Sequence, residues 1–116
     1  MATAGKKKSL LKICDKLWAN KIKDRADRKC EICGSDNYLS AHHIVPRTNY
    51  ALRHDLENGV ALCRRHHLYW AHKDVLDFSA WFTVTFGMKR LAYLETARHR
   101  QSKNDYMAIK LYLEGL

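Results

Sequence analysis

Two short motifs, Cys30-Glu-Ile-Cys33-Gly34 and Cys63-Arg-Arg-His66, bound the segment of the chain with the strongest structural signal. Each end places two metal-binding side chains three residues apart, and a tight turn can direct both at one ion. Gly34 suits the turn that follows the first pair. One such pair is weak evidence for a metal site, but two pairs in a chain of 116 residues are strong evidence. The sequence therefore predicts a structural Zn²⁺ held by Cys30, Cys33, Cys63 and His66, in a filled shell with no position open to substrate.

The charge of the chain indicates the chemistry of its partner. Lys and Arg number 21 against 12 Asp and Glu, which gives a net charge of +9 with His neutral. This excess predicts a polyanionic partner, either nucleic acid or an anionic membrane, and favours nucleic acid; a basic surface without such a partner is the alternative. Because no apolar run is long enough to span a membrane and no secretory signal pattern opens the chain, we expect an intracellular, cytoplasmic protein. In that compartment four cysteines favour metal ligands or free thiols over disulfides.

Hydrophobic periodicity places helices on both sides of the metal-binding stretch. We expect a mobile basic tail over 1–8, a helix over 9–27 with Ser9 as its N-cap, and a buried, non-ligating Cys14 on the apolar stripe of that helix. Short strands over 38–45 and 60–62 and a helix over 64–73 give strand–strand–helix order within 30–73. Residues 77–116 predict three helical segments: 77–86 with Asp77 as its cap, 88–101, and one capped by Asn104. The predicted fold class is α+β and mostly helical, in a single domain over 1–116.

Further residues between and after the two metal-binding pairs carry a family resemblance. They read Ala-His42-His43-Ile-Val-Pro-Arg47, then Asn58, then Leu-Cys63-Arg-Arg-His66-His67. Together with the Cys-x2-Cys pair, this string resembles the HNH endonuclease family, whose fold is a treble-clef-like ββα-metal motif with a structural zinc. The match runs from Cys30 to His67, and its main departure is His66 where the commonest form has a fourth Cys.

The resemblance implies a role for each matching residue. His43 matches the general base that takes a proton from the attacking water, and Asn58 matches the residue that holds the loop and the base in place. His42 and His67 match the ligands of a catalytic divalent ion, which could be Mg²⁺, Mn²⁺ or Ni²⁺. Some relatives add a histidine one helical turn after His67, but Ala71 stands there in this chain. We therefore expect two protein ligands, with His54, His72 and His99 as bystanders.

Two classes of function remain after this comparison. The favoured one is a metal-dependent endonuclease that hydrolyses DNA phosphodiester bonds, with Arg47, Arg64 and Arg65 as candidate phosphate contacts. The alternative is a catalytically inert zinc module that binds nucleic acid or protein. Both need the zinc ligands, but only the nuclease needs His42, His43, Asn58 and His67 together. A protease with catalytic zinc is excluded because the zinc shell is already filled. The layout also resembles small phage-type nucleases, which would act in the cytoplasm of a host cell.

Overall fold

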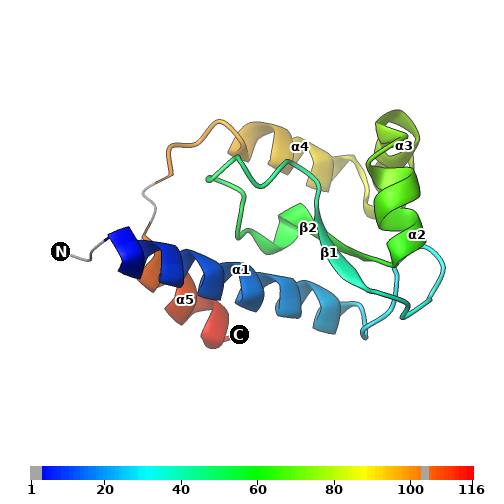
Figure 1. Cartoon of the computed structure of the whole chain (residues 1–116). Helices are drawn as coiled ribbons and strands as arrows, with labels where there is room; N and C mark the ends of the chain where they lie inside the picture. Colours follow the sequence, from blue (N-terminus) through cyan, green and yellow to red (C-terminus); the bar gives the residue numbers. More distant parts are fainter. Residues whose placement is uncertain (1–3, 103–104) are drawn as a thin grey trace.

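Two short antiparallel strands lie at the centre of the structure, a computed structural model that describes residues 4–102 and 105–116 (Figure 1). β1 (Ser40–His43) pairs with β2 (Gly59–Leu62), and the register sets His43 opposite Gly59. Every residue of β2 is buried. The sheet is therefore a small central element enclosed by helices.

Helix α1 (Ala4–Arg25) packs along the hairpin and fixes its position. Trp18 and Ile22 are buried on the helix face that meets β2. The two elements approach so closely at Gly59 that a Cβ there would lie 2.6 Å from atoms of both side chains. Only glycine fits this contact without displacing the helix. Because Gly59 pairs with His43, the close contact at Gly59 also brings α1 near the end of β1.

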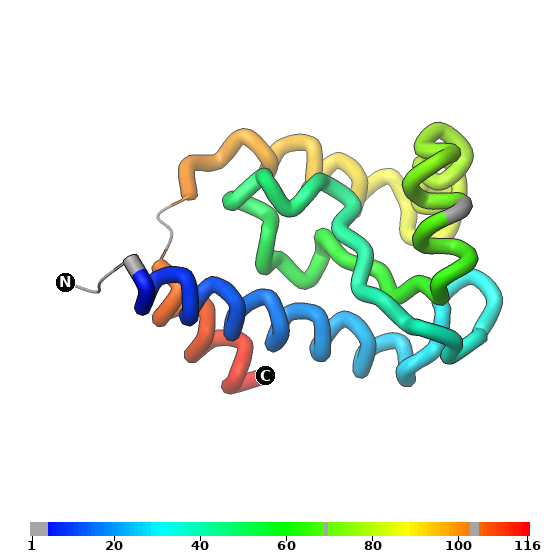
Figure 2. The backbone as a smooth tube through the Cα atoms, in the orientation of Figure 1, coloured from blue at the N-terminus to red at the C-terminus, as the bar shows by residue number. Residues whose placement is uncertain are grey.

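The other helical segments follow β2 in the chain: α2 (Arg64–His66), η2 (His67–Ala71), α3 (Val75–Phe86), α4 (Met88–Ala97) and α5 (Tyr106–Glu114). η2 is one π-helical turn that continues α2 without a break. Phe78 and Phe82 of α3 join Leu94 of α4 in the larger apolar core, which also contains residues of β2. Figure 2 shows α5 alongside α1, on the side of the molecule away from α4.

The loop from β1 to η1 (Leu56–Asn58) runs between α1 and α4. The indole nitrogen of Trp18 donates to the carbonyl of Asp55 at 2.8 Å. The amide of Asn49 donates to the carbonyl of Arg98, just after α4, also at 2.8 Å. The loop is thus attached to a helix on each side, although it contains little regular structure itself.

The predicted α+β, mostly helical class is confirmed, with shifted element boundaries. The first strand covers 40–43 instead of 38–45, and the second covers 59–62 instead of 60–62. The first helix covers 4–25 instead of 9–27, so residues 4–8 of the expected mobile tail are helical; lysine is a good helix former, and Ser9 lies inside the helix. Residues 1–3 of that tail lie outside the described residues.

The predicted helix caps need correction as well. Asp74, and not Asp77, caps α3, and its side chain accepts from the Asp77 backbone N–H at 3.1 Å. Asn104 lies outside the described residues, and the neighbouring Asp105 caps α5 through the Ala108 N–H at 3.1 Å. Within residues 4–102 and 105–116, no helix has both the length and the apolar character needed to cross a membrane.

Candidate active site

The four predicted zinc ligands converge in space. The ligand atoms of Cys30, Cys33, Cys63 and His66 all lie within 4.8 Å of one another. The sulfurs of Cys33 and Cys63 are 3.7 Å apart, and the His66 Nδ1 lies 3.7 Å from the Cys30 sulfur and 3.3 Å from the Cys63 sulfur. Tetrahedral Zn²⁺ bonds would separate two sulfurs by about 3.8 Å and a sulfur from a nitrogen by about 3.6 Å. The donor set therefore fits a structural zinc.

The turn around the first cysteine pair is held by its own backbone. The N–H of Gly34 donates to the carbonyl of Cys30 at 2.8 Å, and the N–H of Cys30 donates to the carbonyl of Ser35 at the same distance. Gly34 has a φ of +78°, a conformation that glycine adopts without strain. The pKa of the Cys30 thiol is lowered. Burial alone would raise this pKa, but hydrogen bonds from the backbone N–H groups of Cys63, Cys33 and Ile32 lower it by more. The lowered pKa favours the thiolate, which is the form that binds zinc.

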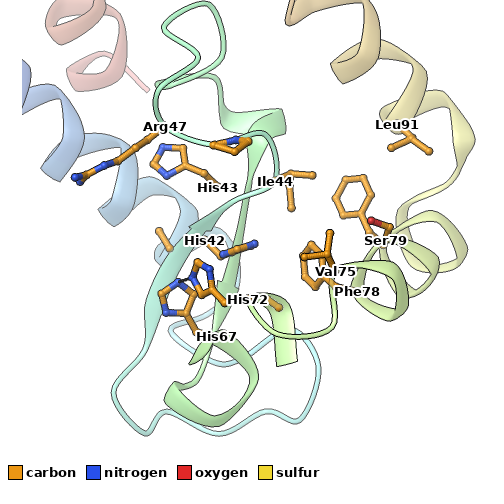
Figure 3. Close-up of a pocket in the computed structure, with 14 residues that line it drawn as sticks. His42, His43, Ile44, Arg47, His67, His72, Val75, Phe78, Ser79 and Leu91 are labelled. Atoms are coloured by element: carbon orange, nitrogen blue, oxygen red, sulfur yellow. Dashed lines mark hydrogen bonds between the residues drawn. The ribbon is translucent and has the colours of Figure 1, made fainter. Parts of the chain in front are cut away.

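A second group of possible ligands consists of three imidazoles (Figure 3). The ligand atoms of His42, His67 and His72 lie within 4.8 Å of one another. The Nε2 atoms of His67 and His72 are 3.1 Å apart. Two nitrogens bound to one ion at about 2.1 Å each would be about 3.0–3.4 Å apart, so this pair is placed as two ligands of one ion would be. The chain therefore has a second group of side chains that could hold a metal.

His72 was expected to be a bystander, and the structure places it in the imidazole group. In a regular α-helix the partner of His67 one turn later would be residue 71. The segment His67–Ala71 is instead a π-helical turn, whose hydrogen bonds span five residues. The wider turn moves residue 72 onto the face of His67. Three protein side chains, and not the two predicted, are thus available to an ion.

The surroundings of His42 and His67 favour the neutral forms of these two side chains. His42 is 8% exposed, and burial, followed by the nearby His67, His72 and His43, lowers its pKa to about 3. Burial and then His72 also lower the pKa of His67. A neutral imidazole has a free lone pair, so an ion can bind without first displacing a proton.

His43 lies at the end of β1 and leaves the strand on a different side from His42 (Figure 3). Its Nε2 lies 2.9 Å from the backbone carbonyl of Arg53. A carbonyl oxygen only accepts hydrogen bonds, so Nε2 must carry the proton. Nδ1 is then the ring nitrogen that is free to take up a proton. Burial, partly offset by this hydrogen bond, lowers the pKa of His43.

Helix α1 supports His43 through contacts that the sequence analysis missed. The ring of Trp18 stacks on the His43 ring at a centroid distance of 4.0 Å and an angle of 11°. Asp15 accepts from the Arg53 guanidinium at 2.8 and 2.9 Å and lies 2.7 Å from the Nε2 of His54. These contacts hold the loop segment whose carbonyl orients His43. His54, expected to be a bystander, belongs to this support and is buried.

Asn58 is fully buried and fastens the loop that follows β1. Its side-chain oxygen accepts from the Val45 N–H at 2.7 Å. Its amide nitrogen donates to the carbonyls of Val45 and Leu52 at 3.0 and 3.1 Å. Leu52 directly precedes Arg53, so Asn58 contributes to the position of the carbonyl that contacts His43. Its action on the expected base is therefore indirect.

Replacing Asn58 with alanine should lower the free energy of unfolding by about 2–4 kcal/mol, because the buried N–H and carbonyl of Val45 would lose their partner and the Leu52 carbonyl would keep only its bond from the Asp55 N–H. Urea unfolding of the purified variant measures this change. Asn37→Ala, at an exposed position, is the matched control and should stay within about 0.5 kcal/mol of the unmodified protein. Equal losses in the two variants would contradict this role for Asn58.

The three candidate phosphate-contacting arginines are all exposed. Arg47 borders a cavity that also exposes His42, His43, His67 and His72. Arg64 and Arg65 lie on α2, on the zinc side of the motif, where the Arg64 guanidinium lies 5.5 Å from the centre of the Tyr38 ring. His99 is exposed in the turn after α4 and is not in either ligand group.

The chain was compared with protein families, with curated proteins and with solved structures. The family model described as HNH endonuclease matches residues 30–68. No curated protein and no solved structure matched. The matched segment contains the four zinc ligands, His42, His43, Asn58 and His67, whereas His72 and the supporting side chains of α1 lie outside it. Residues 30–68 of this chain are therefore similar to an HNH endonuclease domain, and they lie between helices that the family model does not cover.

Proposed function

We propose that this chain is a metal-dependent endonuclease that hydrolyses phosphodiester bonds of DNA. The observation that carries the proposal is the position of His43 beside the three-imidazole group, with one ring nitrogen held by the Arg53 carbonyl and the other free. An inert zinc module would have no need of this arrangement. The proposal includes an intracellular site of action, where DNA is available to the protein.

The residues of the chain would divide the hydrolysis among them. His43 Nδ1 takes a proton from the attacking water, and the Arg53 carbonyl and Trp18 keep the ring in one orientation while it does so. Arg47 contacts the phosphate at the rim of the cavity. A divalent ion held by His42, His67 and His72 would neutralise charge on the phosphoryl group and assist the departing oxygen.

The ligand set indicates which ions suit the site. Imidazole nitrogens suit Ni²⁺, Zn²⁺ and similar ions, whereas Mg²⁺ prefers oxygen ligands. The group contains three imidazoles, and no Asp or Glu in the described part of the chain belongs to it. We therefore expect cleavage with Ni²⁺ to exceed cleavage with Mg²⁺ at equal concentration.

The test of the proposed function is an incubation of the purified protein with supercoiled, linear and branched DNA across Mg²⁺, Mn²⁺, Ni²⁺ and Zn²⁺. Cleavage of DNA that stops when EDTA is added supports the nuclease. Binding of DNA without cleavage under any of these ions would favour the inert zinc module instead.

The rate of cleavage should depend on pH through His43. Burial lowers its pKa below the ordinary value of 6.5, so the ring stays neutral and able to accept a proton at a lower pH than an ordinary histidine. The rate should be nearly level around pH 7 and should fall by about tenfold per pH unit only below the lowered pKa. Measuring kcat/KM from about pH 5 to pH 8 checks this. An acidic limb centred above 6.5 would contradict the assignment of the base to His43.

A further inference from the structure

A cavity of about 600 Å³ opens directly from the three-imidazole group and extends toward α3 and α4 (Figure 3). Its volume lies in the range of pockets that bind small organic groups. The nuclease reaction requires only that a phosphate reach the ion and His43, and it leaves the rest of this cavity without a role.

The two ends of the cavity differ in chemistry. One end carries the guanidinium of Arg47 and the three imidazoles, and a divalent ion held by those imidazoles would add to the positive charge that suits an anion. The other end is apolar and partly aromatic, and is lined by Ile44, Val75, Phe78, Phe82 and Leu91. The two ends adjoin, because the ring of His42 meets the ring of Phe78 edge-on at a centroid distance of 5.0 Å.

A nucleotide has the same two-part character, with an anionic phosphate joined to a flat aromatic base. A phosphate held at the imidazole end would place the base of the same nucleotide at the aromatic end. A paired base cannot enter such a cavity, because it is stacked and hydrogen-bonded inside the duplex. An unpaired base can enter at a much smaller cost, and stacking on an aromatic side chain favours it there.

We propose that the apolar end of the cavity receives the base of an unpaired nucleotide next to the scissile phosphate. This inference rests on the proposed function and narrows its substrate to DNA with unpaired nucleotides, such as single strands, bulges and branch points. The base lies against the apolar lining formed by Val75, Phe78 and Leu91, and Arg47 contacts the adjoining phosphate.

Two neighbouring positions on α3 provide a matched pair of variants. Val75 lines the cavity and is 63% exposed, whereas Leu76 does not line it and is 84% exposed. Val75→Trp would fill the apolar end with an indole, and Leu76→Trp would place the same side chain in solvent. Neither residue is buried, so both variants should fold and retain the two metal sites.

The experiment compares three DNA duplexes: one fully paired, one with a single unpaired nucleotide, and one with an abasic site at that nucleotide. The unmodified protein and Leu76→Trp should cleave the unpaired substrate roughly ten- to a hundredfold faster than the other two. For Val75→Trp, the ratio of the cleavage rate on the unpaired substrate to the rate on either of the other two duplexes should fall toward one. Binding measured without added divalent ion should show the same order of preference.

An equal rate on the three duplexes by the unmodified protein, or a preference that Val75→Trp retains, would overturn the inference and leave the nuclease assignment intact. A protein that cleaves none of the three with any ion would instead overturn the proposed function. The two failures are therefore distinguishable in one experiment.

Discussion

Replacing His43 with alanine is expected to lower the rate of DNA cleavage by about a hundred- to ten-thousand-fold, the usual effect of removing a positioned general base. The reason is the one free nitrogen of its ring, which accepts the proton while the other nitrogen is held by the Arg53 carbonyl. The variant should bind DNA nearly as well as the unmodified protein, because the base acts in the transition state and not in holding the substrate. Single-turnover cleavage with DNA binding measured in parallel separates the two effects.

His99→Ala is the matched control, since His99 is exposed and outside both ligand groups. It should cleave at the rate of the unmodified protein. Because the His43 ring also stacks on Trp18, the zinc content and thermal unfolding of the His43 variant must be measured alongside its activity. A folded His43→Ala protein that cleaves at a near-normal rate would contradict the assignment of the base.

Loss of the zinc site is expected to unfold the segment that matches the HNH family model, residues 30–68. Structural zinc in small domains contributes on the order of 10–16 kcal/mol, which exceeds the stability of most domains of this size. Cys30 and Cys63 are both buried in the larger apolar core, so unpaired thiolates cannot remain there without cost. Elemental analysis after brief EDTA treatment should find about one equivalent of zinc per folded chain, and Cys33→Ser should lose both the zinc and the fold.

The control for the zinc prediction is the remaining cysteine. Cys14 is buried on α1, where its thiol donates to the Tyr106 carbonyl at 3.2 Å, far from the ligand group in the sequence. Cys14→Ser should retain its zinc. His72→Ala should also retain it, which would show that the tightly held ion belongs to the cysteine site. A protein that stays folded with no zinc would contradict the account.

The convergence of Cys30, Cys33, Cys63 and His66 could be predicted because the signal is local. Each pair is three residues apart, and such a pair reaches one ion from a single turn regardless of the surrounding fold. The predicted strand–strand–helix order was then enough to bring the Cys30–Cys33 pair next to the Cys63–His66 pair. The resemblance to the HNH family then supplied candidate roles for His42, His43 and Asn58, and the structure places these side chains around one loop and one cavity.

His72 could not be found by the same reasoning. Under the 3.6-residue period of an α-helix, residue 72 points away from His67. The π-helical turn depends on the hydrogen-bonding of one short segment, which periodicity does not reveal. The pattern of His42, His67 and His72 becomes visible only when the backbone is known.

The support from α1 was missed for a different reason. Asp15 and Trp18 are separated from the residues they contact by more than twenty positions, and their contacts depend on how the helix packs on the hairpin. The apolar stripe predicted that Trp18 would be buried but did not indicate which side chain it would cover. Asp15 is one of two acidic residues on a mainly basic helix, a signal too weak to interpret without the fold.

The most direct test of the account is the rate of DNA cleavage as a function of divalent ion concentration for the unmodified protein, His67→Ala and His43→Ala. His67→Ala removes a ligand, so its cleavage should be weak at low ion concentration and should recover in part as the concentration rises. His43→Ala leaves the three-imidazole group complete and removes the base, so its rate should reach a plateau far below that of the unmodified protein at every ion concentration. Recovery of His43→Ala at high ion concentration, or equal curves for the two variants, would contradict the division of roles between the imidazole group and His43.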